Sequence, residues 1–190
     1  MDEATYKLLD LGLPHHEKEP PGGMTNLNTG QPNSWGRAPE NPDDDLYVPG
    51  TLATARQAGA PAGTVHRHEG WKAGSDSVYP ATVRDWACYV PQQALAEGAP
   101  PPALLVCLDG AGFLSEDGAY RTTTVADNLI HTGQIPPTVI VFINPGKHPT
   151  YTEQRSKEYD TVSDENVNFI VAEILPLVSE LHGVTVTTDP

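Results

Sequence analysis

The residues best placed for chemistry are Asp109-Gly110-Ala111-Gly112, which directly follow the apolar run Ala103–Leu108. An apolar run bounded by turn residues predicts a strand that is buried on both faces, and we place this strand at residues 103–109. The two glycines let the backbone turn sharply and approach a ligand closely. Because ligands bind beyond the carboxyl ends of strands in open parallel sheets, this loop is the first candidate site.

A second apolar run, residues 138–144, ends in Asn144-Pro145-Gly146 and predicts another loop at the carboxyl end of a strand. Arg155 and Glu158 follow this loop and are three residues apart. We interpret them as an ion pair with each other or as residues that line the entrance of the site. His148 lies in the same stretch and is a further candidate for contact with a substrate.

Two histidines could bind a metal ion. His66 and His68 are two residues apart in an alternating segment, residues 63–71, that predicts an edge strand. Their side chains therefore point to the same side of the strand, where they could bind zinc. No cysteine or carboxylate lies nearby at a spacing typical of zinc sites, so a solvent-exposed strand face is the favoured interpretation. We predict no metal site.

The composition argues against nucleic acids and anionic membranes as partners. The 190 residues include 11 Lys and Arg against 25 Asp and Glu, and this formal net charge of −14 leaves little for a basic binding face. No apolar run approaches the roughly 20 residues of a membrane span, and no secretory signal is visible. We therefore expect a cytoplasmic protein in which Cys88 and Cys107 are free thiols in the core.

The chain has two regions of different character. Residues 1–60 hold clusters of turn-forming residues without sustained periodicity, and they predict a low-order N-terminal arm. From residue 61 onward, two alternating segments precede the two apolar runs, and helical patterns follow each run, at 122–131 and 164–181. Pro176 should kink the second helix or start a new turn. This order of elements predicts an α/β domain with a mostly parallel sheet.

Six segments of the second region, in this order, resemble the α/β-hydrolase esterase family in its enterochelin-esterase-like branch. They are Thr82-Val-Arg-Asp-Trp86 with Tyr89-Val-Pro91, Leu108-Asp-Gly-Ala-Gly-Phe113, Asp127-Asn-Leu-Ile-His131, Phe142-Ile-Asn-Pro-Gly146, Arg155-Ser-Lys-Glu-Tyr-Asp160 and Glu173-Ile-Leu-Pro176. The resemblance implies a three-layer α/β-hydrolase sandwich. It also implies hydrolysis of carboxylic esters, such as enterochelin-type trilactones or carbohydrate-linked esters, by a Ser-His-Asp/Glu triad. We expect a small-molecule ester as partner and no cofactor.

The catalytic triad itself is missing from these residues. No Gly-x-Ser-x-Gly occurs, and the turn-like segment Thr187-Thr-Asp-Pro190 resembles the residues just before the serine strand of the family. We therefore interpret residues 61–190 as the N-terminal half of an esterase domain, incomplete at its C-terminus and inactive alone. Two alternatives stay open: a non-catalytic doubly wound module that binds a small ligand, and an inactive fragment.

The resemblance assigns one role in the site by position. In α/β-hydrolases the loop after the third strand donates a backbone N–H to the oxyanion, and this donor corresponds to Ala111, with Gly110 beside it. A plain tight turn is the alternative. For Asp109 we favour a structural carboxylate that accepts hydrogen bonds from loop amides. The candidates for substrate binding around Ala111 are Asp109, Gly112, Arg155, Glu158 and His148.

The resemblance also affects how the chain could associate. It places strand 103–109 between strand 138–144 and the missing serine strand. Without the serine strand, 103–109 becomes a sheet edge with neither charge nor proline in its apolar run. Such an edge can pair with another chain, so we expect self-association through it.

Overall fold

The computed structural model describes residues 16–17, 36–37, 55–116, 120–150, 152 and 154–187. The chain divides into two compact units, Met1–Val48 and Pro49–Pro190. In the first unit, strands β1 (His16–Glu17) and β2 (Gly36–Arg37) pair antiparallel. Most of the predicted N-terminal arm lies outside the described residues.

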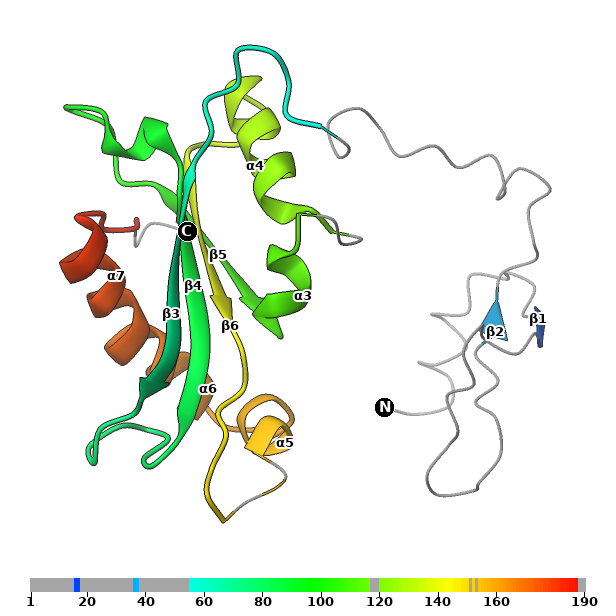
Figure 1. Ribbon diagram of the computed structural model, residues 1–190, viewed down its shortest axis with the longest axis vertical. Coiled ribbons are helices and arrows are strands. Elements are labelled where there is room, and N and C mark those ends of the chain that lie inside the picture. The colour runs from blue at the N-terminus through cyan, green and yellow to red at the C-terminus, as the bar shows by residue number, and fades with distance from the viewer. Residues whose placement is uncertain are drawn as a thin grey trace, which may run out of the picture. The chain divides into compact units, whose positions relative to one another are not determined.

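A four-stranded sheet forms the centre of the second unit, with the strand order β3-β4-β6-β5 (Figure 1). The strands are β3 (Thr64–Lys72), β4 (Val83–Val90), β5 (Ala103–Leu108) and β6 (Thr138–Ile143). β4 runs antiparallel to both β3 and β6, and only β5 and β6 are parallel. The prediction of a mostly parallel sheet is therefore wrong for the described strands, because the short connection from β3 to β4 reverses the chain whereas β5 reaches β6 by a helical crossover.

Helices cover both faces of this sheet (Figure 1). On one face lie α3 (Gly110–Leu114) and α4 (Thr122–His131). On the other face lie α6 (Glu165–Phe169), the π-helical segment η3 (Ile170–Ile174) and α7 (Leu175–His182). The 3₁₀-helix η2 (Gln92–Leu95) follows β4, and α5 (Gln154–Tyr159) follows β6. Among the described residues, no helix is long and apolar enough to cross a membrane.

The two predicted helices differ in how regular they are. The prediction of a helix over 122–131 is confirmed by α4. The predicted helix 164–181 is instead three consecutive pieces, α6, η3 and α7, with Pro176 in the first turn of α7. Proline cannot donate a backbone hydrogen bond, so the wider π-helical turns directly before it accommodate the change.

The burial of the strands depends on their place in the sheet. Every residue of β6 is buried, because β6 has a strand on each side and helices on both faces. β5 has a described neighbour on one side only, and its Leu105 and Leu108 are 44% and 36% exposed. The prediction that this strand is buried on both faces is therefore wrong, whereas its position at a sheet edge agrees with the expected strand order.

Alternation along β4 distributes its side chains to the two faces of the sheet. Trp86 and Cys88 belong to the core beneath α7, and Ala87 and Tyr89 belong to the core beneath α4. The prediction of free cysteines in the core is confirmed, since Cys88 and Cys107 are both buried and unpaired. Burial raises the pKa of the Cys88 thiol to about 12, so this thiol is unreactive at neutral pH.

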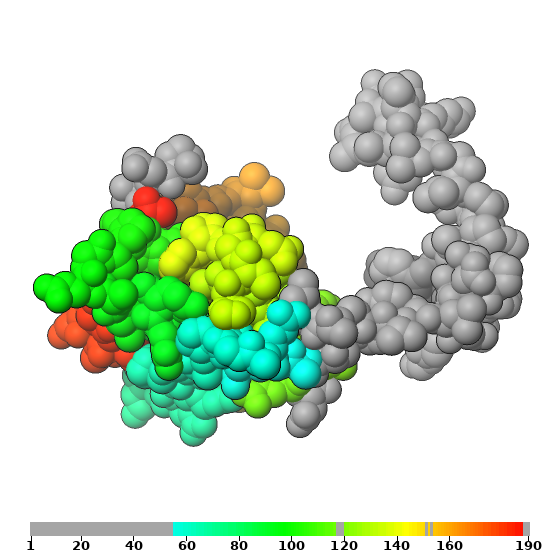
Figure 2. Space-filling view, turned by 90° about the horizontal axis from the view of Figure 1, so that it is seen from above, coloured from blue at the N-terminus to red at the C-terminus, as the bar shows by residue number. Residues whose placement is uncertain are grey.

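Residues 55–63 bind to α4 through two buried polar side chains of the helix (Figure 2, cyan segment). Asp127 accepts hydrogen bonds from Arg56 Nε, Gly63 N and Tyr89 Oη, each at 2.6–2.8 Å. Asn128 bonds the backbone of Ala55 and Gln57. These polar contacts hold residues 55–60 on the second unit.

Candidate functional site

The carboxyl ends of β5 and β6 lie side by side, with Leu108 paired to Ile143. The turn from β5 into α3 is made by Asp109, whose φ of 54° and ψ of 42° are left-handed. Aspartate is one of the few residues with a side chain that visit this region at modest cost. The sharp turn thus falls on Asp109, and our assignment of it to the two glycines is wrong.

Gly110 and Gly112 nevertheless differ in what they require. A Cβ at Gly110 would lie 2.5 Å from backbone atoms of Phe142 and Ile143, so only glycine lets α3 pack directly on β6. A Cβ at Gly112 would meet nothing within 4 Å. Gly110 therefore fixes the loop against the sheet, whereas Gly112 leaves open space beside it.

The backbone N–H of Ala111 points to a side chain that the sequence did not identify as a site residue. It donates a hydrogen bond of 3.0 Å to Oδ1 of Asn144, at the exposed surface. Asn144 directly follows β6, just as Asp109 directly follows β5. Its place at a strand's carboxyl end was the available signal for including it.

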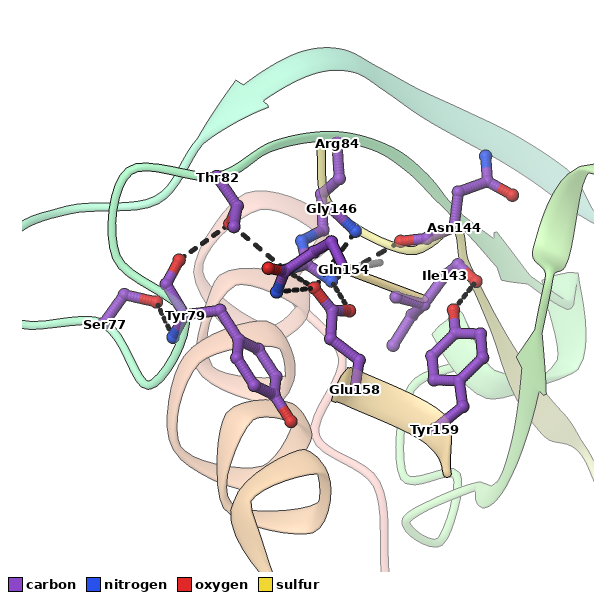
Figure 3. Close-up of polar contacts among 10 residues, drawn as sticks. All are labelled: Ser77, Tyr79, Thr82, Arg84, Ile143, Asn144, Gly146, Gln154, Glu158 and Tyr159. Atoms are coloured by element: carbon purple, nitrogen blue, oxygen red, sulfur yellow. Dashed lines mark hydrogen bonds and ion pairs between the residues drawn. The ribbon is translucent and has the colours of Figure 1, made fainter. Parts of the chain in front are cut away.

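The backbone of Asn144 is held on both sides. Its N–H donates to the carbonyl of Asp85 at 3.2 Å. Its own carbonyl accepts from Arg84 Nη1 at 3.4 Å (Figure 3). Tyr159 Oη donates to the carbonyl of the preceding Ile143 at 3.1 Å. The strand end that carries Asn144 is therefore anchored while its carboxamide remains half-buried at the surface.

The anchor of this strand end is a buried ion pair between Arg84 of β4 and Glu158 of α5 (Figure 3). The Arg84 Nη1–Glu158 Oε2 and Nη2–Oε1 distances are 2.7 and 3.0 Å, and both side chains are 0% exposed. Gln154 Nε2 and the N–H of Gly146 also donate to Oε1 of Glu158. Glu158 therefore pairs with Arg84 and not with Arg155, and its carboxylate is buried.

Arg84 could have been identified from the sequence. It lies on the face of β4 that also carries Trp86 and Cys88, and a charged residue on an apolar face requires a buried partner. The identity of that partner could not be read in this way, because Glu158 lies 74 residues along the chain.

Arg155 forms an exposed ion pair with Asp109. Its Nε–Oδ1 and Nη2–Oδ2 distances are 3.0 and 2.6 Å, and the side chains are 55% and 46% exposed. These hydrogen bonds from Arg155 lower the pKa of Asp109. We expected this carboxylate to accept hydrogen bonds from loop amides; the structure instead shows it bound to the Arg155 guanidinium, with no side-chain cap on α3. Asp109 and Arg155 together lie beside Ala111.

A hollow of about 150 Å³ opens beside Ala111 and Asn144. Its base is apolar, with Ala87, Leu114 and Phe142, and its rim is polar, with Arg67, Glu69 and Asp85. This volume is smaller than the 300–1,000 Å³ of most small-molecule sites. His148 is not among the lining residues; its Nδ1 lies 3.0 Å from the hydroxyl of Thr150 in the loop after β6.

An apolar groove of about 480 Å³ runs along the β5 edge. Leu105, Cys107 and Leu108 of β5 line it from the sheet, and Phe113 and Val125 line it from α3 and α4. Ala111 therefore borders the small hollow, and Phe113 of the same helix borders the larger apolar groove.

The predicted solvent-exposed face of His66 and His68 is instead part of a contact between β3 and α7. His182 stacks on His66 with 4.0 Å between ring centroids, and its Nε2 lies 3.1 Å from Nε2 of His68. His68 also stacks on Trp86. Burial lowers the pKa of both His68 and His182. Within the described ranges, no group of three or more His, Cys, Asp or Glu residues could hold a metal ion.

Comparison with known proteins identifies solved structures with a similar fold. The chain matches no protein-family model and no curated protein. It is similar to the ferulic acid esterase AmCE1/Fae1A of Anaeromyces mucronatus, solved with ferulic acid, at 16% identity and a TM-score of 0.50, over 73% of this chain and 50% of that one. The enterobactin esterase FES of Shigella flexneri, solved in the presence of enterobactin, matches at 23% identity and a TM-score of 0.47, over 66% of this chain and 29% of that one.

These likenesses concern the fold alone. The second unit has an α/β-hydrolase-like fold similar to that of the ferulic acid esterase, as the sequence resemblance implied. The chain spans about half the length of the ferulic acid esterase and less than a third of the enterobactin esterase.

Proposed function

We propose that this chain forms the oxyanion-binding part of a carboxylic ester hydrolase of the serine esterase type. The serine, the acid and the triad histidine would lie outside these 190 residues, in a complete three-layer α/β-hydrolase domain. The observation that carries the proposal is the exposed backbone N–H of Ala111, which lies at the carboxyl end of β5 and already donates to a carbonyl-type oxygen at 3.0 Å. A small-molecule ester, such as an enterochelin-type trilactone or a carbohydrate-linked ester, would be the substrate.

The chemistry needs a fixed donor at this position. When a nucleophile attacks an ester, the carbonyl oxygen gains negative charge, and a donor at 2.7–3.1 Å stabilises that charge. Ala111 is suited to this role because Gly110 packs its loop on β6 and the Asp109–Arg155 pair closes the turn before it. The groove along β5 would accept the serine strand, and without that strand we propose self-association of the chain there. We also propose a cytoplasmic location.

The test is the replacement of Ala111 by proline in a protein that joins these residues to a serine-bearing second half. Position 111 lies in the first turn of α3, where proline is tolerated, and the preceding Gly110 has no Cβ to meet the proline ring. We expect turnover of p-nitrophenyl acetate to fall by about 10²–10³. The control, Ala111→Gly, keeps the N–H and should retain activity.

The outcomes separate this function from a non-catalytic role. Equal turnover in both variants would remove Ala111 from the site. Saturable binding of a small ligand without any ester turnover in the joined protein would favour the binding module instead. The 190-residue chain alone should show no turnover, because its sequence contains no Gly-x-Ser-x-Gly motif.

A further inference from the structure

The donor proposed for the oxyanion is occupied by the protein's own side chain. Ala111 N–H has a single proton, and Oδ1 of Asn144 accepts it at 3.0 Å, a normal length for a full hydrogen bond. We infer that Asn144 is a gating residue, whose carboxamide blocks the Ala111 donor until a substrate carbonyl displaces it. This inference rests on the proposed function.

Replacing the Asn144 carboxamide by the substrate oxygen as acceptor of the Ala111 N–H stabilises the transition state more than the bound substrate. A neutral ester carbonyl competes with the Asn144 carboxamide as one neutral acceptor with another, so displacement gains little in the ground state. The developing oxyanion is a charged acceptor, and charge-assisted hydrogen bonds are about twice as strong. Because the substrate carbonyl displaces the carboxamide already in the bound complex, the Asn144 contact lowers the affinity for substrate and for the transition state equally, and its effect should fall on KM.

The surroundings of Asn144 allow its side chain to move without its backbone. The backbone N–H and carbonyl are held by Asp85 and by Arg84, which is itself locked in the buried pair with Glu158. The carboxamide, in contrast, borders the hollow of about 150 Å³ beside α3. Glu69 and Asp85 on its rim present carboxylate oxygens to which a displaced Asn144 amide could donate.

Two substitutions at position 144 have opposite expected effects in the protein that joins these residues to a serine-bearing second half. Asn144→Ala removes the competing acceptor and should raise kcat/KM about three- to tenfold, mainly through a lower KM. Asn144→Asp offers a charged acceptor that holds the N–H more tightly and repels the oxyanion, so kcat/KM should fall. A merely structural role for Asn144 predicts losses in both variants, and that pattern would overturn the gate.

Failure of the gate and failure of the proposed function give different results. If Ala111→Pro abolishes turnover but Asn144→Ala equals the wild type, the function stands and the gate is wrong. If no variant has ester turnover, the function itself is wrong and the gate fails with it.

A measurement on the 190-residue chain tests the blocking contact without activity. In the first turn of α3 the Ala111 amide has no acceptor within the helix, so Asn144 accounts for its protection. We expect hydrogen exchange at Ala111, followed by NMR, to be about three- to tenfold faster in Asn144→Ala and unchanged or slower in Asn144→Asp. Equal exchange rates in the wild type and Asn144→Ala would show that the donor is not blocked.

Discussion

Replacing Glu158 by glutamine should destabilise the protein by about 3–5 kcal/mol. Glu158 accepts four hydrogen bonds, two from Arg84, one from Gln154 and one from the N–H of Gly146, and its side chain is 0% exposed. Glutamine has nearly the same volume, so no cavity forms. It removes the charge, however, and leaves the buried Arg84 cation, whose Nε already has no hydrogen-bond partner, without a counter-ion.

The double variant Arg84→Met/Glu158→Gln separates the ion pair from general packing. Arg84 lies over the ring of Phe169 at 4.2 Å, and methionine can keep that apolar contact. With no buried cation left, the double variant should recover much of the loss, because the large cost comes from breaking the pair and not from lacking it. Urea unfolding followed by tryptophan fluorescence measures the free energy of unfolding of the wild type, of Glu158→Gln and of the double variant.

The matched control is Asp109→Asn, which breaks the exposed pair with Arg155. Exposed ion pairs contribute little, so this variant should leave the free energy of unfolding nearly unchanged. If Glu158→Gln costs no more than Asp109→Asn, or if the double variant is no better than Glu158→Gln, the ion pair is not buried as described. The anchoring of Asn144 through Arg84 would then lose its basis.

Two further predictions concern pH and association. The pKa values of His68 and His182 are lowered, by burial first and then by neighbouring histidines, so the folded state binds fewer protons than the unfolded chain below pH of about 6.5. The free energy of unfolding should therefore fall as the pH drops through that value and level off below the lowered pKa values. A variant with phenylalanine at both positions should show a flatter dependence of this free energy on pH. An equally steep dependence in that variant would contradict the role of this pair. For association, Leu105→Lys places a charge on the exposed β5 edge and should shift a self-associated chain to monomer in size-exclusion chromatography; a wild-type chain that is already monomeric at all concentrations would refute the edge contact.

Local sequence patterns determined the elements of this protein and the place of its site. Period-two alternation predicted the edge strand that the structure shows as β3, and helical spacing predicted α4 at its observed bounds. The apolar runs ending in polar or glycine-containing loops located the strand ends where Ala111 and Asn144 meet. These features depend on residues close in sequence, because periodicity and turn preferences are short-range properties.

Only the tertiary structure decided the partners of the charged and polar side chains. Alternation assigns Arg84 to a face of β4 but cannot say that Glu158, 74 residues later, lies opposite it. The same holds for Arg155 with Asp109, for His68 with His182, and for Ala111 with Asn144. The order and direction of the strands bring these residues together. The partner of each side chain therefore follows from how the strands are arranged, and not from its neighbours in the sequence.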